Sequence, residues 1–351
     1  MNLFLHVSLQ EKILFTKNMA LALKSGISLV NSLKMVQKQA KSKTFKRILT
    51  SLMDDANKGV FLSAGLAKFH FVFGELFVNI IRVAETSGTL PENLLYLGDE
   101  LGKRDALRKK VRSALIYPVI ILIATIAIGA LMILFVFPKI LPLFQGAKVE
   151  LPLTTRILIS VSGIISNYGI FILIGIILFI IGFRLLLRLP PFKAIYDRML
   201  SYAPLFGRAI INYNMANFTR TFALLLRSGV RITEALDITS ATVTNLVYQR
   251  HLRAVADGVR KGEFLSKYLY GYPHDFPIIL TNMIEVGENT GNLNENLNYL
   301  SEYYENEVDD FTKNLSSILE PILLIVMGGM VAFIALSFIT PIYQITRSIN
   351  R

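Results

Sequence analysis

Three long stretches without a charged residue constrain this chain more than any other feature of its sequence. One runs from Val119 to Phe137 and another from Pro321 to Ile339, each 19 residues long, and a third lies between Arg156 and Arg184. At 1.5 Å per residue, a helix of that length spans about 29 Å, which matches the hydrocarbon core of a bilayer. Since lipid offers the backbone no hydrogen-bond partner, each stretch is predicted to be a transmembrane helix.

The charges that flank these stretches predict how the chain crosses the membrane. Basic residues crowd the entrance to the first span and the exit of the second, so the positive-inside rule places both flanks, and the N-terminus, in the cytoplasm. The predicted segments are a first cytoplasmic domain (1–113), span one (114–138), an external loop (139–155), span two (156–188), a second cytoplasmic domain (189–317), span three (318–342) and an external tail (343–351).

The two predicted cytoplasmic domains repeat one sequence pattern at a fixed offset of 203 residues. FTKNMALALKSG at 15–26 matches FTRTFALLLRSG at 218–229 in 7 of 12 positions. VAETSGTLPENLLYL at 83–97 matches VGENTGNLNENLNYL at 286–300 in 9 of 15. Because apolar residues recur at helical spacing, the sequence predicts an all-α membrane protein with two repeated helical-bundle domains and three transmembrane helices.

A Glu-x-x-Gly motif is present in both repeats, as Glu85 to Gly88 and as Glu288 to Gly291. Glycine suits the left-handed position that closes a helix, so most of the motif is predicted to be a helix–turn–helix corner. The two glutamates lie in the last turn of the preceding helix, where the helix dipole disfavours an acid. Either a tertiary Arg or Lys partner or a contact with another molecule is therefore expected to favour them.

Two prolines stand at the repeat offset, each where a cytoplasmic helix enters its span: Pro118 and Pro321. Proline removes one backbone hydrogen bond and bends a helix. A fixed kink at the membrane surface is the favoured interpretation. A hinge that passes rotation of the cytoplasmic domain to the span is the alternative.

The basic excess of the chain is concentrated in its first domain. Residues 1–113 carry 18 basic and 9 acidic residues, whereas residues 189–317 carry 12 and 14. The densest basic cluster contains Lys34, Lys38, Lys41, Lys43, Lys46 and Arg47. It is expected either to dock an acidic partner or anionic lipid, or to be a solvated face beside the membrane. A nucleic-acid partner is not expected, because the cluster has one aromatic residue and no recognisable binding module.

The sequence lacks the motifs on which most enzyme chemistry depends. It has no GxxxxGK[ST] phosphate loop, no Gly-x-Ser-x-Gly elbow and no cysteine, and its four histidines are scattered. We therefore expect no catalytic residue, no cofactor and no metal site. The predicted spans contain no aspartate, which argues for a scaffold. A small-solute transporter or channel subunit, which would want buried ionisable groups, is the alternative.

The chain resembles the type II secretion F and type IV pilus platform family from about Phe15 to Ile342. Three features carry the resemblance: the duplicated F-T-[KR]…[KR]-S-G, the duplicated E-x-[ST]-G-x-L, and the two spans that begin with a proline. The resemblance implies a non-enzymatic, homo-oligomeric inner-membrane platform for a pilus or for a secretion or competence pseudopilus. The partners it implies are a cytoplasmic hexameric ATPase, prepilin or pseudopilin subunits and other inner-membrane assembly proteins. The positions that match the family motif are Glu85, Gly88, Glu288 and Gly291.

Longer members of this family carry an additional N-terminal cytoplasmic stretch, whereas this chain begins 14 residues before Phe15. We therefore take the basic cluster, at Lys41, Lys43, Lys46 and Arg47, as the candidate contact for the ATPase. An archaellum-type or tight-adherence platform is a more distant alternative, because those relatives differ in the number and order of their spans.

Overall fold

The computed structural model describes residues 7–136, 138–139, 142, 152–204 and 206–349. Within these residues it contains helices and turns and no strand. The chain divides into two compact units. We call Met1–Lys109 with Pro190–Asp310 the polar unit, and Lys110–Leu189 with Phe311–Arg351 the apolar unit.

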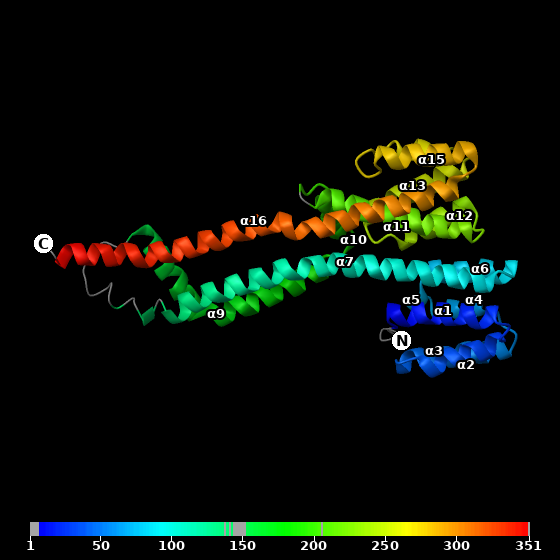
Figure 1. Cartoon of the computed structure of the whole chain (residues 1–351), viewed down its shortest axis with the longest axis horizontal. Coiled ribbons are helices and arrows are strands. Elements are labelled where there is room, and N and C mark those ends of the chain that lie inside the picture. Colours follow the sequence, from blue (N-terminus) through cyan, green and yellow to red (C-terminus); the bar gives the residue numbers. More distant parts are fainter. Residues whose placement is uncertain (1–6, 137, 140–141, 143–151, 205, 350–351) are drawn as a thin grey trace. The chain divides into compact units, whose positions relative to one another are not determined.

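The polar unit holds the helices of both repeats (Figure 1). The first repeat comprises α1 (Leu9–Lys24), α2 (Leu29–Gln39), α3 (Lys43–Asn57), α4 (Leu62–Ala67), α5 (His70–Phe73), α6 (Glu75–Ser87) and the start of α7 (Leu90–Leu131). After α10 (Pro190–Ser201), the second repeat comprises α11 (Gly207–Arg227), α12 (Ile232–Thr242), α13 (Leu246–Arg260), α14 (Leu265–Leu269), α15 (Ile278–Thr290) and the start of α16 (Leu293–Ile349).

The helices confirm the internal repeat in register. The first and last residues of α2, α3 and α6 reappear 203 residues later as those of α12, α13 and α15. The predicted fold class, an all-α protein with two repeated helical bundles, is therefore confirmed. Among the described residues, the repeats differ at residues 271–276, which form turns where the first repeat has α5.

An equivalent phenylalanine lies at the centre of each repeat. Phe15 is fully buried, and its ring centroid lies 6.0 Å from those of both Phe45 and Phe73. Its counterpart Phe218 lies 6.2 Å from Phe276, which is the counterpart of Phe73. The duplicated F-T-[KR] motif therefore encodes a core position in each repeat, since large aromatic side chains dominate the burial of apolar surface.

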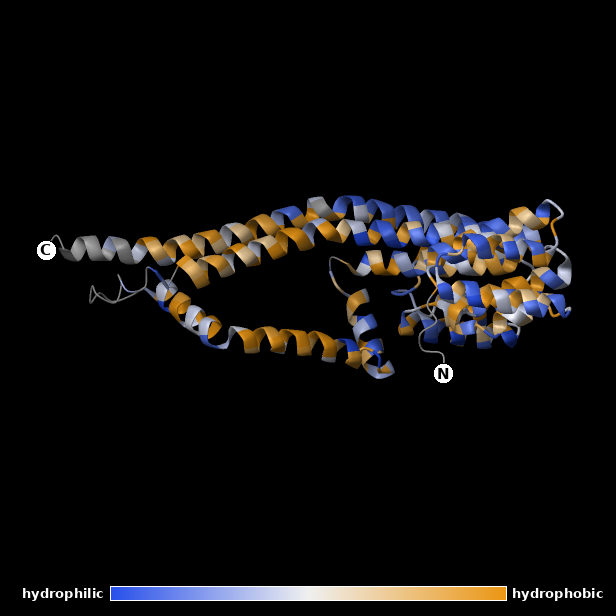
Figure 2. Ribbon diagram, turned by 90° about the horizontal axis from the view of Figure 1, so that it is seen from below, coloured by the Kyte–Doolittle hydropathy of each residue, from blue (hydrophilic) through white to orange (hydrophobic). Residues whose placement is uncertain are grey.

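The apolar unit contains α9 (Leu153–Leu186), the second half of α7 with the π-helical turn η1 (Met132–Val136), and the end of α16. Among the described residues, three helical stretches are long and apolar enough to cross a bilayer: Leu90–Val136, Leu153–Leu186 and Leu293–Thr340. Figure 2 shows the hydrophobic colour along the apolar-unit parts of these long helices, whereas their remaining parts and the shorter helices mix polar and apolar residues. The three transmembrane helices expected from the sequence are thus supported.

Two hydroxyl groups join the helices of the apolar unit. Thr155 donates to the carbonyl of Ser337 at 2.9 Å, and Ser162 donates to the carbonyl of Ile133 at 3.1 Å. Small hydroxylated residues are a common way for helices to associate where the surroundings are apolar.

The expected segment boundaries stay predictions. Helices α7 and α16 run through the boundaries at 113/114 and 317/318 without a break. Most of the expected loop at 139–155 lies outside the described residues. Pro118 and Pro321 lie inside α7 and α16, and the kink or hinge expected there also stays a prediction.

The glycines of the two Glu-x-x-Gly motifs end their helices as expected. Gly88 after α6 has φ 73° and Gly291 after α15 has φ 75°, both in the left-handed region. Beyond Gly88, the N–H of Thr89 donates to the carbonyl of Ala84 at 2.9 Å, so that the helix end is closed by a backbone hydrogen bond. A side chain at either glycine would strain the backbone.

We expect Gly88→Ala to destabilise the protein by about 1–2 kcal/mol, because a Cβ atom is unfavourable in the left-handed conformation. The control is Gly102→Ala, since Gly102 lies inside α7 with open space around it and alanine is a better helix former. The measurement is thermal unfolding of the full chain in detergent, followed by circular dichroism. Equal melting temperatures for the two variants would contradict the expectation.

Candidate functional site

The glutamate of the first Glu-x-x-Gly motif binds the backbone of another helix. Glu85 is half-buried in the last turn of α6. Its carboxylate accepts hydrogen bonds from the N–H groups of Leu62 and Ser63, the second at 2.8 Å. These amides belong to the first turn of α4, and the residue before that helix, Phe61, provides no side-chain cap. Glu85 therefore acts as the N-cap of α4 from 22 residues further along the chain.

The second repeat reproduces this contact atom for atom. Glu288, half-buried in the last turn of α15, accepts hydrogen bonds from the N–H groups of Leu265 at 2.6 Å and Ser266 at 2.9 Å. These residues begin α14, which Phe264 precedes without a side-chain cap. The duplicated glutamate is thus a duplicated helix cap.

This geometry explains why an acid is favoured where its own helix dipole opposes it. The N-terminus of a helix carries unsatisfied N–H groups and a positive partial charge, so a carboxylate placed there is stabilised. The sequence suggested a basic side chain or a second molecule as the partner, whereas the observed partners are backbone amides. The available signal was the phenylalanine at the N-cap of both short helices, where Ser, Thr, Asp or Asn is usual.

The basic cluster lies on α2, α3 and the connection between them. All six side chains are exposed, and in the part of the chain that the structure describes none of them forms an ion pair. The residues at the same positions of the second repeat are Asp237, Ala241, Thr244, Leu246, Gln249 and Arg250. Because α12 and α13 form with the same bounds, the repeat folds without this cluster. Five of the six charges are therefore a property of the first repeat alone, whereas Arg250 keeps a basic residue at the position of Arg47.

A buried arginine that the sequence analysis did not identify joins the two repeats within the polar unit. Arg220 of α11 is 6% exposed; its Nε lies 3.1 Å from a carboxylate oxygen of Glu100 on α7, and its guanidinium also contacts Glu305 on α16. Further along α11, the guanidinium of Arg227 lies 3.7 Å from the ring centroid of Tyr96. A buried charge of this kind is costly unless it is paired, so these contacts hold α11 against α7.

Comparison with known proteins places the chain in a family. The model of the family described as type II secretion system (T2SS), protein F matches it twice, at residues 15–138 and 218–341. The two matches start 203 residues apart, as the two repeats do. The chain belongs to the type II secretion system protein F family.

Relatives match along nearly the whole chain. It is 32% identical over 342 residues to type IV pilus assembly protein PilC of Thermus thermophilus, an alignment that covers 97% of this chain and 84% of the relative. It is 29% identical over 345 residues to type II secretion system protein F of Vibrio cholerae, covering 98% and 85%. The family resemblance inferred from the duplicated motifs is therefore confirmed.

We expect Glu85→Gln and Glu288→Gln each to lower the free energy of unfolding by about 1–3 kcal/mol, because an amide has one acceptor oxygen where the carboxylate offers two. The matched control is Glu92→Gln, since Glu92 is exposed in the first turn of α7. The measurement is unfolding of the full chain in detergent. Unchanged stability together with loss of chemical cross-links between copies would instead favour an intermolecular contact of these glutamates.

Proposed function

We propose that this chain is a non-enzymatic inner-membrane platform on which a type IV pilus or a type II secretion pseudopilus is assembled. The observation that carries the proposal is the family match in two copies, combined with three helices long and apolar enough to span a bilayer. The names of its relatives, a type IV pilus assembly protein and a type II secretion system protein F, point to the same kind of machine.

In this proposal both repeats and the N-terminus face the cytoplasm. The basic residues that flank the first two spans support this orientation through the positive-inside rule. The packing of the two repeats in one compact unit supports a common side of the membrane for both, in agreement with the two spans that lie between them in the chain.

The platform would couple a cytoplasmic hexameric ATPase to the insertion of prepilin or pseudopilin subunits, as a homo-oligomer beside other inner-membrane assembly proteins. The basic cluster supports a docking role, because the fold does not require it and its charges are unpaired among the described residues. Helices α7 and α16, each unbroken from the polar unit into the apolar unit, would carry motion of the repeats to the spans.

Photo-crosslinking in living cells tests the platform directly. We expect a crosslinking amino acid at Lys43 to capture a hexameric ATPase, identified by mass spectrometry. The matched control position is Thr244, which is exposed in the second repeat at the place that Lys41 occupies in the first. Recovery of neither an ATPase nor a prepilin from any exposed position of the polar unit would contradict the proposal.

Reversing the charge of the basic cluster tests the docking face. We expect the combined substitution of Lys41, Lys43, Lys46 and Arg47 by Glu to weaken ATPase binding about tenfold or more, since four charge pairs of about 0.5 kcal/mol each are lost and reversed. The difference from the parent chain should shrink at high salt, because exposed charges are screened.

The control variant reverses four exposed basic residues of the second repeat, Arg231, Arg253, Lys261 and Lys267. Binding is measured on the purified full chain in detergent, with the ATPase of the same host. Equal binding by the parent chain and the cluster variant would identify the cluster as a solvated face and leave the platform role to the crosslinking test.

A further inference from the structure

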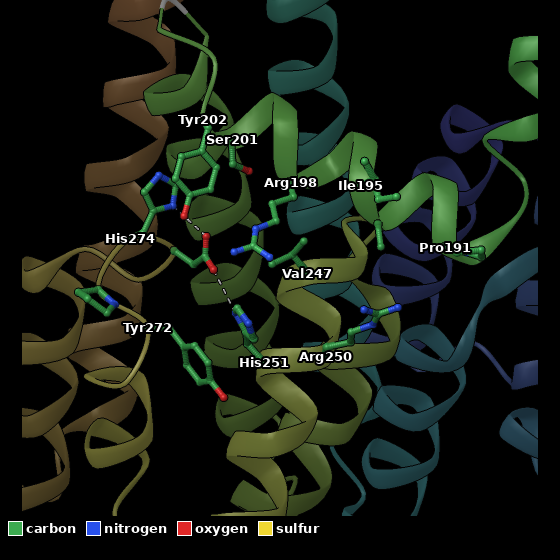
Figure 3. A pocket seen from close by; sticks show the side chains of 13 residues that line it. Pro191, Ile195, Arg198, Ser201, Tyr202, Val247, Arg250, His251, Tyr272 and His274 are labelled. Carbon is green, nitrogen blue, oxygen red and sulfur yellow. Dashed lines mark hydrogen bonds and ion pairs between the residues drawn. The ribbon is translucent and has the colours of Figure 1, made fainter.

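A cavity of about 660 Å³ opens in the second repeat, between α10, the start of α13 and the turns at 271–276 (Figure 3). Its lining includes Arg198, Arg250, His251, His274 and Asp275, together with Tyr202 and Tyr272. A cavity of this size falls within the range of small-molecule sites, which is about 300–1,000 Å³.

Asp275 and the two histidines form one connected cluster in the wall of the cavity. The Asp275 carboxylate lies 3.2 Å from Nδ1 of His251 and 3.1 Å from Nδ1 of His274. The His251 ring stacks on Tyr272 and the His274 ring on Tyr202, each with ring centroids 3.9 Å apart. Burial by itself raises the pKa of Asp275, but the contacts with His251 and His274 outweigh it and leave that pKa below its usual value. The one carboxylate in the wall is therefore already partnered by the two histidines.

The two arginines, by contrast, bring charge that no carboxylate compensates. Arg198 comes from α10 and Arg250 from α13; both are exposed, and within the described residues neither forms an ion pair. The two helices are held together beside the cavity, because the Asp197 carboxylate accepts the N–H of Leu246 at 2.8 Å. Two arginine side chains thus line one cavity from two helices that are bonded to each other.

The first repeat shows that the fold does not require the histidines and Asp275, although it keeps Arg47 at the position of Arg250. At the repeat offset, His251, Tyr272, His274 and Asp275 correspond to Ile48, Phe69, Phe71 and Val72. The apolar version of this segment forms α5, whereas the polar version forms the turns that line the cavity. The same architecture is therefore built without the cluster, so the cluster calls for another explanation than folding.

We propose that this cavity binds a phosphate-bearing anion through the guanidinium groups of Arg198 and Arg250. Arginine forks match phosphate oxygens with two parallel hydrogen bonds, and the aromatic walls leave an apolar surface beside them. Within the described residues, no group of three or more His, Cys, Asp and Glu is placed to hold a metal ion, so an anion suits this lining better than a cation. The phosphate could belong to a soluble ligand or to a phospholipid headgroup, since only residues 187–189 separate α9 from α10.

The first arm of the test uses inorganic pyrophosphate and the full chain in nanodiscs of neutral phosphatidylcholine. Isothermal titration calorimetry compares the parent chain with Arg198→Gln/Arg250→Gln and with the control Arg231→Gln/Arg253→Gln, whose arginines are exposed outside the cavity. We expect the cavity variant to bind about tenfold or more weakly, because charge-assisted hydrogen bonds are lost, and the control to bind as the parent does.

The second arm uses nanodiscs that contain phosphatidic acid, with retained lipid counted by native mass spectrometry. Retention that the cavity variant loses and the control keeps would assign the phosphate to a headgroup, whereas selective loss of pyrophosphate binding would assign it to a soluble ligand. Failure of the parent chain to bind either probe, or equal losses in both variants, would overturn the proposal. Neither arm depends on filament assembly, so its outcome is separate from that of the platform function.

A third variant exchanges the cluster for its first-repeat residues, as His251→Ile/His274→Phe/Asp275→Val. We expect it to keep the helix content and the melting temperature of the parent, because the first repeat folds with these residues. Binding of whichever probe the parent chain retains should not fall, because the variant removes a carboxylate from the wall and keeps both arginines. Loss of binding in this variant, once it is shown to fold, would contradict the assignment of the anion to Arg198 and Arg250.

Discussion

The first turn of one short helix in each repeat has backbone amides that its own sequence leaves uncapped, and the rest of the repeat depends on how they are satisfied. Glu85 and Glu288 supply the acceptors from the end of the helix that packs alongside. A buried amide without a partner would cost about as much as a lost hydrogen bond, so this contact fixes the short helix against its neighbour. Directly after it, Gly88 or Gly291 turns the chain into the long helix that continues toward a span. One corner thus sets both the packing of the bundle and the start of α7 or α16.

The parts of this fold that could be predicted from the sequence are those that a periodic pattern or a single residue type indicates. Uncharged runs of bilayer length, a constant offset between two similar segments and glycines at helix ends each have one dominant physical meaning. The partner of Glu85 could not be predicted in the same way, because it is a backbone group 22 or 23 residues away and carries no side-chain signature. The buried ion pairs of Arg220 could not be predicted for a related reason. Its carboxylate partners lie on two helices that only the tertiary structure brings to α11.

A duplicated chain contains its own control for function. Helices α2 and α12, or α3 and α13, share their bounds at the repeat offset, so the residues that both copies keep are those that the bundle requires. Phe15 and Phe218 are such residues, and so are the two glutamates. Residues that are present in only one copy are not required for the bundle to fold. The exposed lysines of the first repeat and the polar turn of the second fall in this group, and they are therefore the places where the two copies can have acquired different partners.

In the proposed platform, the two long helices would carry motion imposed by a partner toward the membrane. A displacement imposed on one turn of an α-helix is carried along it, because every turn is bonded to the next by backbone hydrogen bonds. Pro118 and Pro321 each interrupt that ladder by one bond, at the same position of the two repeats. The carbonyl groups four residues earlier, those of Ala114 and Ser317, are left without the helical N–H that would otherwise bind them. We therefore expect a fixed kink at these two points, and a hinge that passes rotation of the repeats to the span is the alternative.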